Sequence, residues 1–253
     1  MTAAPVIVVE GLTKRYENVL AVDDISFSVE RCATCALLGG NGAGKTTTLA
    51  MLLGLILPTV GRIFVLGEDM LRHRYRALPR MNFSSPYVDL PQRLTVTENL
   101  TVYARLYGVR GVRRRLQCLA EDLDIAAFMG RRYGTLSSGQ KTRVALAKSL
   151  LNEPELLLMD EPTASLDPDT ADRIRSYLQS YQKASGATLL LASHNMVEVE
   201  RLCSDVLMLR AGRIVARGTP EALIGRYRRR TLEEVFLDIA RHRSSEGQVR
   251  SAS

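Results

Sequence analysis

The segment from Gly39 to Thr46 has the composition and spacing of a loop that binds phosphate groups. It reads GGNGAGKT and fits the pattern G-x-x-x-x-G-K-T. Glycines allow backbone N–H groups to turn inward around a polyphosphate, because no β-carbon blocks the loop. Lys45 supplies a mobile positive charge for the outer phosphates, and the Thr46 hydroxyl suits Mg²⁺. We therefore predict a nucleotide site formed by Gly39, Gly40, Asn41, Gly42, Ala43, Gly44, Lys45, Thr46 and Thr47.

Two adjacent carboxylates, Asp160 and Glu161, follow the apolar segment LLLM at residues 156–159. Such an apolar segment indicates a buried strand, so both acids would lie at its C-terminal end, where open α/β sheets bind ligands. A helix N-cap or a pair of surface acids would explain the same residues, but the glycine loop favours a functional role. We expect Asp160 to hold Mg²⁺ and Glu161 to orient or deprotonate an attacking water.

These side chains need a sheet that brings several strand ends together. The glycine loop lies between the apolar segment CATCALL and the segment KTTTLAMLLGL, so we predict a strand before the loop and a helix after it. Residues 96–151 read as mostly helical. Apolar strands that alternate with helices indicate a parallel sheet covered on both faces, and therefore an α/β fold. The predicted strands are 6–12, 20–29, 32–38, 61–68, 156–160, 187–193 and 205–218, with a further helix at 168–183.

A third motif, LSSGQ at residues 136–140, precedes the helical segment KTRVALAKSLL. Small residues at a helix N-terminus can form a second anion site, although a simple helix N-cap would use the same residues. Here the sequence resembles the ATP-binding subunits of ABC transporters, whose hallmark at this place is LSGGQ. The segments LLLMDEPTASLD and LLLASH follow in the family's order, and the resemblance covers about residues 6–218.

The resemblance implies a particular α/β architecture. It is a P-loop NTPase core with an antiparallel β portion at the N-terminus and an inserted α-helical subdomain at about residues 82–152. The ATPase domain would span residues 1–218. Residues 219–253 would form a C-terminal helical extension and a frayed basic tail, because the final segment SSEGQVRSAS is small and polar.

The resemblance also explains why one chain carries two anion sites. In this family two copies dimerise head to tail, and each ATP lies between one glycine loop and the partner copy's signature. We therefore expect a homodimer, and Ser165 and Asp167 match the loop that crosses its interface. The signature residues that would contact the partner's ATP are Ser137, Ser138, Gly139 and Gln140, of which Ser138 stands where glycine is usual.

Two further positions take their roles from the resemblance. Tyr16 falls where an aromatic side chain stacks on adenine, although a half-buried strand tyrosine would fit the same pattern. His194 follows the predicted strand 187–193 and matches the histidine that contacts the γ-phosphate and supports the attacking water. A lone histidine is more often a surface or core residue, but its place at a strand end favours the functional role.

The sequence departs from the family at a glutamine that contacts Mg²⁺ and couples to the membrane partner. Matching the segment FSSP to the family's usual F-Q-x-P puts Ser84 at that position. Gln92 lies too close to the following LTV segment to replace it, unless the loop is remodelled. Serine is shorter than glutamine, so we expect its contact with Mg²⁺ to need a water. Gly40 stands where proline is usual, which loosens the loop slightly.

The composition agrees with a globular ATPase and argues against several other classes. The 253 residues are 46% hydrophobic, which argues against general disorder. The longest apolar run, residues 49–57, is far shorter than the roughly 20 residues of a membrane span. The formal charge is +7, and two arginine clusters, around residues 113 and 229, fit solvated faces as well as binding sites. We expect no nucleic acid partner.

Cys32 and Cys35 form a CxxC that reads as part of a strand. A redox CxxC usually opens a helix, and a zinc site needs two more ligands nearby. We therefore interpret both cysteines as structural and expect a reducing compartment.

The resemblance implies hydrolysis of ATP, with Mg²⁺, that drives a separate integral-membrane permease from the cytoplasmic face of the membrane. The segment TLEEVFLDIA at residues 231–240 resembles the tail of drug and polysaccharide exporter subunits, which favours export, although it also fits an amphipathic terminal helix. The alternative is a soluble ABC-type ATPase that drives a cytoplasmic assembly machine, such as one for iron–sulfur assembly.

Overall fold

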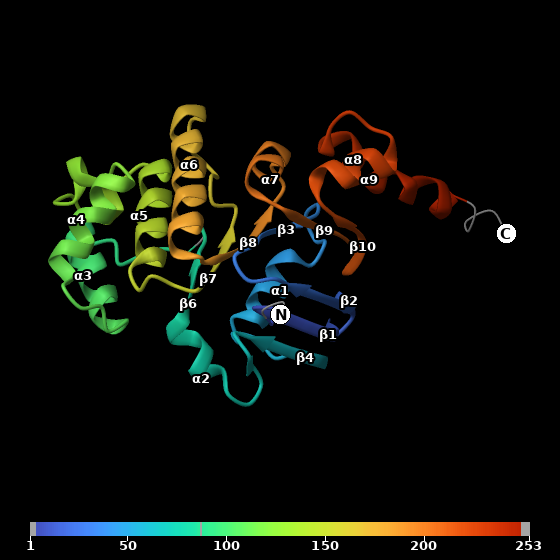
Figure 1. Ribbon diagram of the computed structural model, residues 1–253, viewed down its shortest axis with the longest axis horizontal. Coiled ribbons are helices and arrows are strands. Elements are labelled where there is room, and N and C mark those ends of the chain that lie inside the picture. Colours follow the sequence, from blue (N-terminus) through green and yellow to red (C-terminus); the bar gives the residue numbers. More distant parts are fainter. Residues whose placement is uncertain (1–3, 87, 249–253) are drawn as a thin grey trace.

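The chain folds around two sheets of different size, and the larger one carries the candidate site. The computed structural model describes residues 4–86 and 88–248, with residues 241–248 described as backbone alone. The larger sheet has the order β10-β9-β3-β8-β7-β6, and all neighbours except β9 and β10 are parallel (Figure 1). Its strands are β3 (Thr34–Leu38), β6 (Met81–Ser84), β7 (Leu156–Asp160), β8 (Thr188–Ser193), β9 (Asp205–Arg210) and β10 (Arg213–Gly218).

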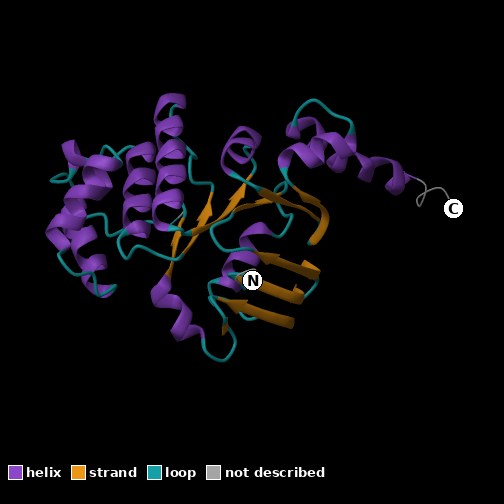
Figure 2. Cartoon of the chain, viewed as in Figure 1, coloured by secondary structure: helices purple, strands orange, loops and turns teal. Residues whose placement is uncertain are grey.

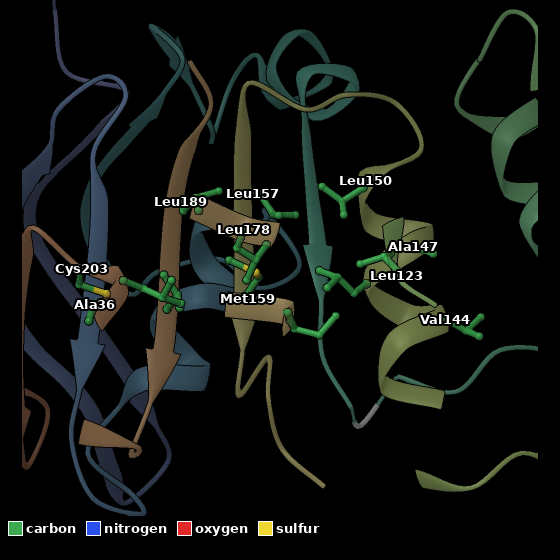
Figure 3. Packing of buried hydrophobic residues seen from close by; sticks show 14 of the residues in the cluster. Ala36, Leu123, Val144, Ala147, Leu150, Leu157, Met159, Leu178, Leu189 and Cys203 are labelled. Atoms are coloured by element: carbon green, nitrogen blue, oxygen red, sulfur yellow. The ribbon is translucent and has the colours of Figure 1, made fainter. Parts of the chain in front are cut away.

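The central strands of this sheet are buried on both faces, as their continuous apolar sequences predict. In β7, Leu156 and Leu158 belong to one hydrophobic cluster, whereas Leu157 and Met159 belong to the other. Successive side chains of a strand point to opposite faces, so one strand supplies both clusters. Figure 3 shows the second cluster, in which Leu157 and Met159 lie near Leu178 of the helical layer. The predicted parallel sheet is thus confirmed.

The smaller sheet is antiparallel and is built mainly from the N-terminal residues, as predicted, with the order β2-β1-β4-β5. Helix α1 (Lys45–Leu52) packs between the two sheets (Figure 2). Its Leu49 and Leu52 share a hydrophobic cluster with Ile7 of the smaller sheet and Leu190 of the larger one. This packing ties the two sheets together. The strands of the smaller sheet are β1 (Ile7–Tyr16), β2 (Val19–Val29), β4 (Val60–Val65) and β5 (Glu68–Asp69).

Helices cover the other face of the larger sheet and continue outward beyond β6. The predicted helical content of residues 96–151 and the predicted helix at 168–183 are both found. In Figure 1 two of these helices lie at the outer end of the molecule, farthest from the smaller sheet. The outer helices are α3 (Val96–Leu106) and α4 (Val112–Asp122), and those nearer the sheet are α5 (Ser138–Leu150), α6 (Pro168–Ser185) and α7 (Met196–Leu202).

The sequence did not predict strand β6, which pairs with β7 at the edge of the larger sheet. Residues 82–84 were placed inside the helical insertion 82–152, but they lie in this strand. Asn82 and Ser84 interrupt the apolar pattern, so four residues give too weak a strand signal. The other short helices that were not predicted are α2 (Arg74–Ala77), η1 (Leu78–Arg80), η2 (Ala126–Phe128), η3 (Tyr133–Thr135) and α7.

Two helices, α8 (Pro220–Tyr227) and α9 (Leu232–Gln248), end the described chain. Leu232, Val235 and Ile239 of α9 are buried in the cluster on the helical face of the larger sheet. The backbone of α9 is helical through part of the segment that was expected to fray. The rest of that segment, residues 249–253, lies outside the described residues.

The cysteines in the described part of the chain are free thiols. Cys32 lies in the turn before β3 with an exposed thiol that donates to the Gly186 carbonyl (Sγ to O, 3.1 Å), and Cys35 is a buried free thiol of β3. Within residues 4–86 and 88–248 no group of three or more His, Cys, Asp or Glu side chains could hold a metal. In the same part of the chain, every helix is too short or too polar to cross a bilayer.

Candidate active site

The glycine loop joins β3 to α1, which is the strand–loop–helix arrangement predicted for it. Gly42 and Gly44 have φ values of 74° and 104°, in the region that favours glycine. A β-carbon at Gly44 would also stand 2.6 Å from the carbonyl oxygen of Ala21, which is too close for any side chain. A hollow of about 300 Å³ opens beside the loop, lined by residues 19–21 and 40–47. The loop and the start of α1 therefore present their backbone to a ligand-sized space.

Lys45 folds back over the loop that precedes it. Its Nζ donates to the carbonyl oxygens of Gly39 (2.6 Å) and Gly40 (3.3 Å), and the residue is buried. Burial lowers the pKa of Lys45, while the charges of Glu161 and Asp160 act in the opposite direction. These contacts hold an ammonium group beside the hollow, where a phosphate could replace the carbonyl oxygens as its partner.

Asp160 and Thr46 meet although they are 114 residues apart in the sequence. The Thr46 hydroxyl donates to Oδ2 of Asp160 at 3.4 Å, and Asp160 is buried. Burial and the neighbouring charge of Glu161 raise the pKa of Asp160. A hydroxyl and a carboxylate in contact are hard oxygen ligands of the kind that Mg²⁺ accepts, so the donor set fits this ion. The two residues predicted to hold Mg²⁺ are thus adjacent.

Glu161 and His194 form the closest polar pair at this edge of the sheet. They follow the neighbouring parallel strands β7 and β8, and Glu161 Oε1 lies 2.5 Å from His194 Nδ1. The Glu161 backbone has a φ of 51°, and its N–H donates to the Ala192 carbonyl at 2.8 Å. Glu161 is buried, whereas the His194 side chain is 69% exposed. A buried carboxylate paired with an exposed imidazole can orient a water that attacks a bound phosphate.

The signature residues form the N-terminal cap of α5. The Ser137 hydroxyl accepts from the Gln140 N–H (3.3 Å), and the Gln140 side chain accepts from the Ser137 N–H (3.1 Å). Gly139 lies against Ser165 in the loop after β7. In the part of the chain that the structure describes, no hydrogen bond joins this cap to the glycine loop of the same molecule. The cap and the loop are two separate sites in one copy.

Tyr16 and Asp167 lie at the ends of two elements, β1 and α6. Tyr16 ends β1 beside Val19, which lines the hollow next to the glycine loop, and it is 43% exposed. Asp167 is the N-cap of α6 and accepts from the Thr170 N–H at 3.0 Å, and this hydrogen bond lowers the pKa of Asp167. Ser165 has a φ of 64° in the same loop.

Comparison with known proteins decides the family. A family model described as "ABC transporter" matches residues 22–164, which is more than half of the chain. The chain belongs to the ABC transporter family. It is an ATP-hydrolysing subunit of a transporter of this family. A model described as "AAA domain, putative AbiEii toxin, Type IV TA system" matches residues 130–200.

Similar ABC proteins include two that are named "Nod factor export ATP-binding protein I". The one from Ralstonia nicotianae is 41% identical over 88% of this chain and 70% of its own length. The one from Rhizobium leguminosarum bv. viciae is 39% identical over 85% of this chain and 69% of its own length. These similarities do not favour the alternative of an assembly ATPase.

Two solved structures agree in fold. An "ATP binding subunit of ABC transporter" superposes with a TM-score of 0.84 at 29% identity, over 93% of this chain and all of that one. The cbiO1 subunit of Clostridium perfringens, part of the transporter complex cbiONQ, gives a TM-score of 0.77 at 28% identity over 88% of this chain and 92% of its own. The predicted α/β ATPase fold is thus confirmed.

Ser84, which stands at the family's glutamine position in this ABC ATPase, belongs to the larger sheet. Ser84 ends β6, is 5% exposed and pairs with Met159, the residue before Asp160. It therefore lies at the edge of the sheet where the carboxylates lie. The Gln92 side chain instead donates to Asp89 (Nε2 to Oδ2, 3.1 Å), and the Gln92 backbone carbonyl accepts from the Gly134 N–H (3.0 Å). Both Gln92 contacts lie outside the core sheet.

Two charged residues near the site, Glu198, which is buried, and Lys148, which is half-buried, were not predicted from the sequence of this ABC ATPase. Glu198 of α7 lies behind Glu161 and accepts hydrogen bonds from two hydroxyl groups. Lys148 of α5 donates to the Phe83 carbonyl (3.3 Å) and lies below the ring of Tyr103, 5.5 Å from its centroid. Each residue occurs in a helical pattern that also fits a solvent-facing charge, so the sequence carries no signal for these contacts.

Proposed function

We propose that this chain binds ATP and Mg²⁺ between its own glycine loop and the signature of a second copy, and that hydrolysis drives an integral-membrane permease. The observation that carries the catalytic part is the contact between Glu161 and His194, beside Asp160 and Thr46. A carboxylate held by an imidazole at a strand end is suited to orient and deprotonate water. The glycine loop follows β3, the parallel strand next to β8, and would hold the phosphate that this water attacks.

Each residue of the site has a role in this proposal. Backbone N–H groups of the glycine loop and the Lys45 ammonium bind the outer phosphates. Thr46 and Asp160 hold Mg²⁺, which when bound neutralises charge on the phosphates. Glu161 orients and deprotonates the water, and His194 contacts the γ-phosphate. The exposed ring of Tyr16, beside the hollow, stacks on adenine.

A second copy of the chain would complete the site. The α5 N-terminus presents its first backbone N–H groups as an anion site, because only the Gln140 N–H is capped by the Ser137 hydroxyl. Because that cap is separate from the glycine loop of its own copy, a head-to-tail homodimer would bring the two sites together. The residues that we propose on the partner's ATP are Ser137, Ser138, Gly139 and Gln140, with Ser165 and Asp167 at the interface.

Exposed apolar side chains near α1 support a membrane-protein partner. Leu55 and Leu57 follow α1, Tyr75 lies on α2, and all three are exposed. Nη1 of Arg74 donates to the Gly54 carbonyl at 3.1 Å, which holds α2 against the segment after α1. Large apolar side chains left exposed are candidates for an interaction site. We propose that Leu55, Leu57 and Tyr75 contribute to the permease contact.

The relatives named for Nod factor export favour the export direction for this chain as well. We place it peripherally at the cytoplasmic face of the membrane. We propose an ATPase domain, residues 1–218, and a C-terminal extension, residues 219–253. The helical subdomain expected near 82–152 would begin after β6, which ends at Ser84. Recognition of the transported molecule falls to the permease in this arrangement.

The substitution Glu161→Gln tests the catalytic assignment. The amide keeps the size of the side chain but cannot accept a proton from water, so kcat should fall by about 10²–10⁴-fold. ATP binding, measured by direct titration, should persist, and an ATP-bound dimer should accumulate in light scattering after size exclusion. The matched control is Glu221→Gln, which changes an exposed carboxylate on α8. Hydrolysis by Glu161→Gln within about threefold of the unsubstituted protein would remove Glu161 from the mechanism.

A further inference from the structure

Behind the Glu161–His194 pair lies a buried carboxylate that the proposed mechanism does not use. Glu198 of α7 is 1% exposed. Its Oε1 accepts from the Thr163 hydroxyl at 2.9 Å, and its Oε2 accepts from the Ser193 hydroxyl at 2.7 Å. Thr163 follows Glu161 by two positions, and Ser193 immediately precedes His194. One side chain therefore joins the two segments that carry the pair.

This arrangement differs from an ordinary helix cap. Glu198 is the third residue of α7, and a glutamate there commonly reaches back to the N–H of the N-cap residue. Here the N–H of the N-cap, Asn195, donates to the Ser193 hydroxyl at 3.1 Å instead. The Glu198 side chain is turned inward to Thr163 and Ser193. Capping of α7 therefore does not account for its position.

The Ser193 hydroxyl extends the link to Glu161 itself. Its Oγ lies 3.4 Å from Glu161 Oε2, while the other oxygen of Glu161 faces His194. A hydroxyl has one proton and can donate to only one carboxylate at a time, so the shorter contact to Glu198 holds it. Glu198 thereby fixes the Ser193 hydroxyl, which is the group next to Glu161 Oε2.

Burial and the neighbouring charge of Glu161 make the ionised form of the Glu198 carboxyl group unfavourable. Burial raises the pKa of Glu198, and the nearby Glu161 carboxylate adds to the rise. The hydrogen bonds from Ser193 and Thr163 and the charge of Arg175 on α6 act in the opposite direction. Burial of an acid next to another acid is unfavourable for folding, and such groups cluster at functional sites.

We propose that Glu198 is a positioning residue for ATP hydrolysis, which fixes Glu161 and His194 relative to each other through the hydroxyls of Thr163 and Ser193. The inference rests on the proposed role of Glu161. The carboxylate of Glu161 must point at the attacking water within a few tenths of an ångström, and supporting hydrogen bonds provide that order. Glu198 contacts neither the glycine loop nor Thr46 among the described hydrogen bonds, so ATP binding should not depend on it.

The experiment compares Glu198→Ala with Glu198→Gln in steady-state hydrolysis. Alanine removes both links, so kcat should fall by about tenfold or more while KM for ATP stays within about twofold. Glutamine keeps an acceptor for one hydroxyl and offers an amide N–H to the other, so kcat should return to within about threefold of the unsubstituted protein. The matched control is Glu200→Ala, which removes an exposed glutamate of the same helix that accepts from the Leu232 N–H. Its Tm should fall without a loss of kcat.

A second pair of variants covers the case in which Glu198→Ala does not fold. Ser193→Ala and Thr163→Val each remove one of the two links, and each should lower kcat at constant KM. Where Glu198→Ala folds, Ser193→Ala combined with Glu198→Ala should be no slower than Glu198→Ala alone, because both changes act on one connection. Additive losses would overturn the proposal, and so would a Glu198→Ala kcat within about twofold of the unsubstituted protein. Equal losses in the alanine and glutamine variants would overturn it as well.

Glu161→Gln, measured in the same preparation, separates the two hypotheses. If it leaves kcat unchanged, the catalytic role of Glu161 is wrong. If it abolishes turnover while Glu198→Ala keeps kcat within about twofold of the unsubstituted protein, only the positioning role of Glu198 is wrong.

Discussion

Gly139 of the signature packs directly against Ser165 of the loop after β7. A β-carbon on Gly139 would stand 3.0 Å from the Ser165 carbonyl oxygen, which is tighter than an ordinary van der Waals contact. Thr142, one turn further along α5, donates to the Ala164 carbonyl of the same loop at 3.3 Å. The signature helix and the loop at 164–165 are therefore held together by direct contacts.

Gly139→Ala should disturb the contact between α5 and Ser165 without disturbing helix α5 itself. Alanine favours a helix by about 1 kcal/mol over glycine, so a loss would come from the contact with Ser165 or from the proposed contact with the partner's ATP, and not from an unstable helix. We expect hydrolysis to fall about tenfold, with ATP binding to the single copy unchanged. Gly130→Ala is the control, because no atom lies within 4 Å of a β-carbon there. Similar rates for both variants would show that the close contact has no role in turnover.

Lys45→Ala should weaken nucleotide binding itself. The ammonium that donates to Gly39 and Gly40 is the positive charge buried in the cradle, and its removal leaves the outer phosphates without that partner. Direct titration with ATP should show at least about tenfold lower affinity. Lys183→Ala, on the exposed side of α6, serves as the charge-matched control. Unchanged affinity in Lys45→Ala would contradict the assignment of this loop as the ATP site.

Ser84→Gln should change permease-stimulated hydrolysis more than basal hydrolysis. Ser84 lies at the sheet edge beside the carboxylates, and an amide there would add a direct oxygen ligand for Mg²⁺. Thr46, Asp160 and Glu161 remain, so the basal rate should persist. Both rates are measured with and without the reconstituted permease, and Ser84→Ala controls for loss of the hydroxyl. Equal effects on the two rates would show that this loop is not the coupling element.

Glu198→Gln should stabilise the protein more at high pH than at low pH. The folded-state pKa of Glu198 is raised above its ordinary value, so the folded protein binds this proton more tightly than the unfolded chain. The resulting stability is present below the unfolded pKa and is lost as the pH rises through the folded pKa. Glutamine does not titrate, so its Tm advantage over the unsubstituted protein should widen from about pH 5 to about pH 8. A constant or shrinking difference would contradict the raised pKa, and Glu221→Gln provides the exposed control.

Residues that act within one continuous motif were the ones that sequence reasoning placed best. The glycine loop lies between a strand and a helix, as its flanking patterns predict. The order of Asp160 and Glu161 after an apolar strand is likewise local, because a strand end is visible in the sequence as the end of an apolar run. The antiparallel N-terminal sheet followed from the family resemblance and is confirmed.

Three features that depend on contacts between distant segments were missed: strand β6 and the settings of Glu198 and Lys148. Strand β6 is four residues long and is stabilised by pairing with β7, more than 70 positions later, so its own pattern is too weak to predict it. Glu198 fits a helix cap in the sequence, but the approach of β7 to β8 turns its side chain toward Thr163 and Ser193. Lys148 fits an exposed helical charge, but it lies against β6 and α3.

Local spacing alone was enough to predict which groups could bind phosphate and which acids could serve a metal and a water, because backbone freedom and side-chain chemistry are properties of neighbouring residues. The distances that make those groups work were set by the order of the parallel strands. That order brings Glu161 within 2.5 Å of His194 and Asp160 within 3.4 Å of Thr46, across separations of 33 and 114 residues. Pairing between strands depends on long-range burial and hydrogen bonding, which no short segment encodes.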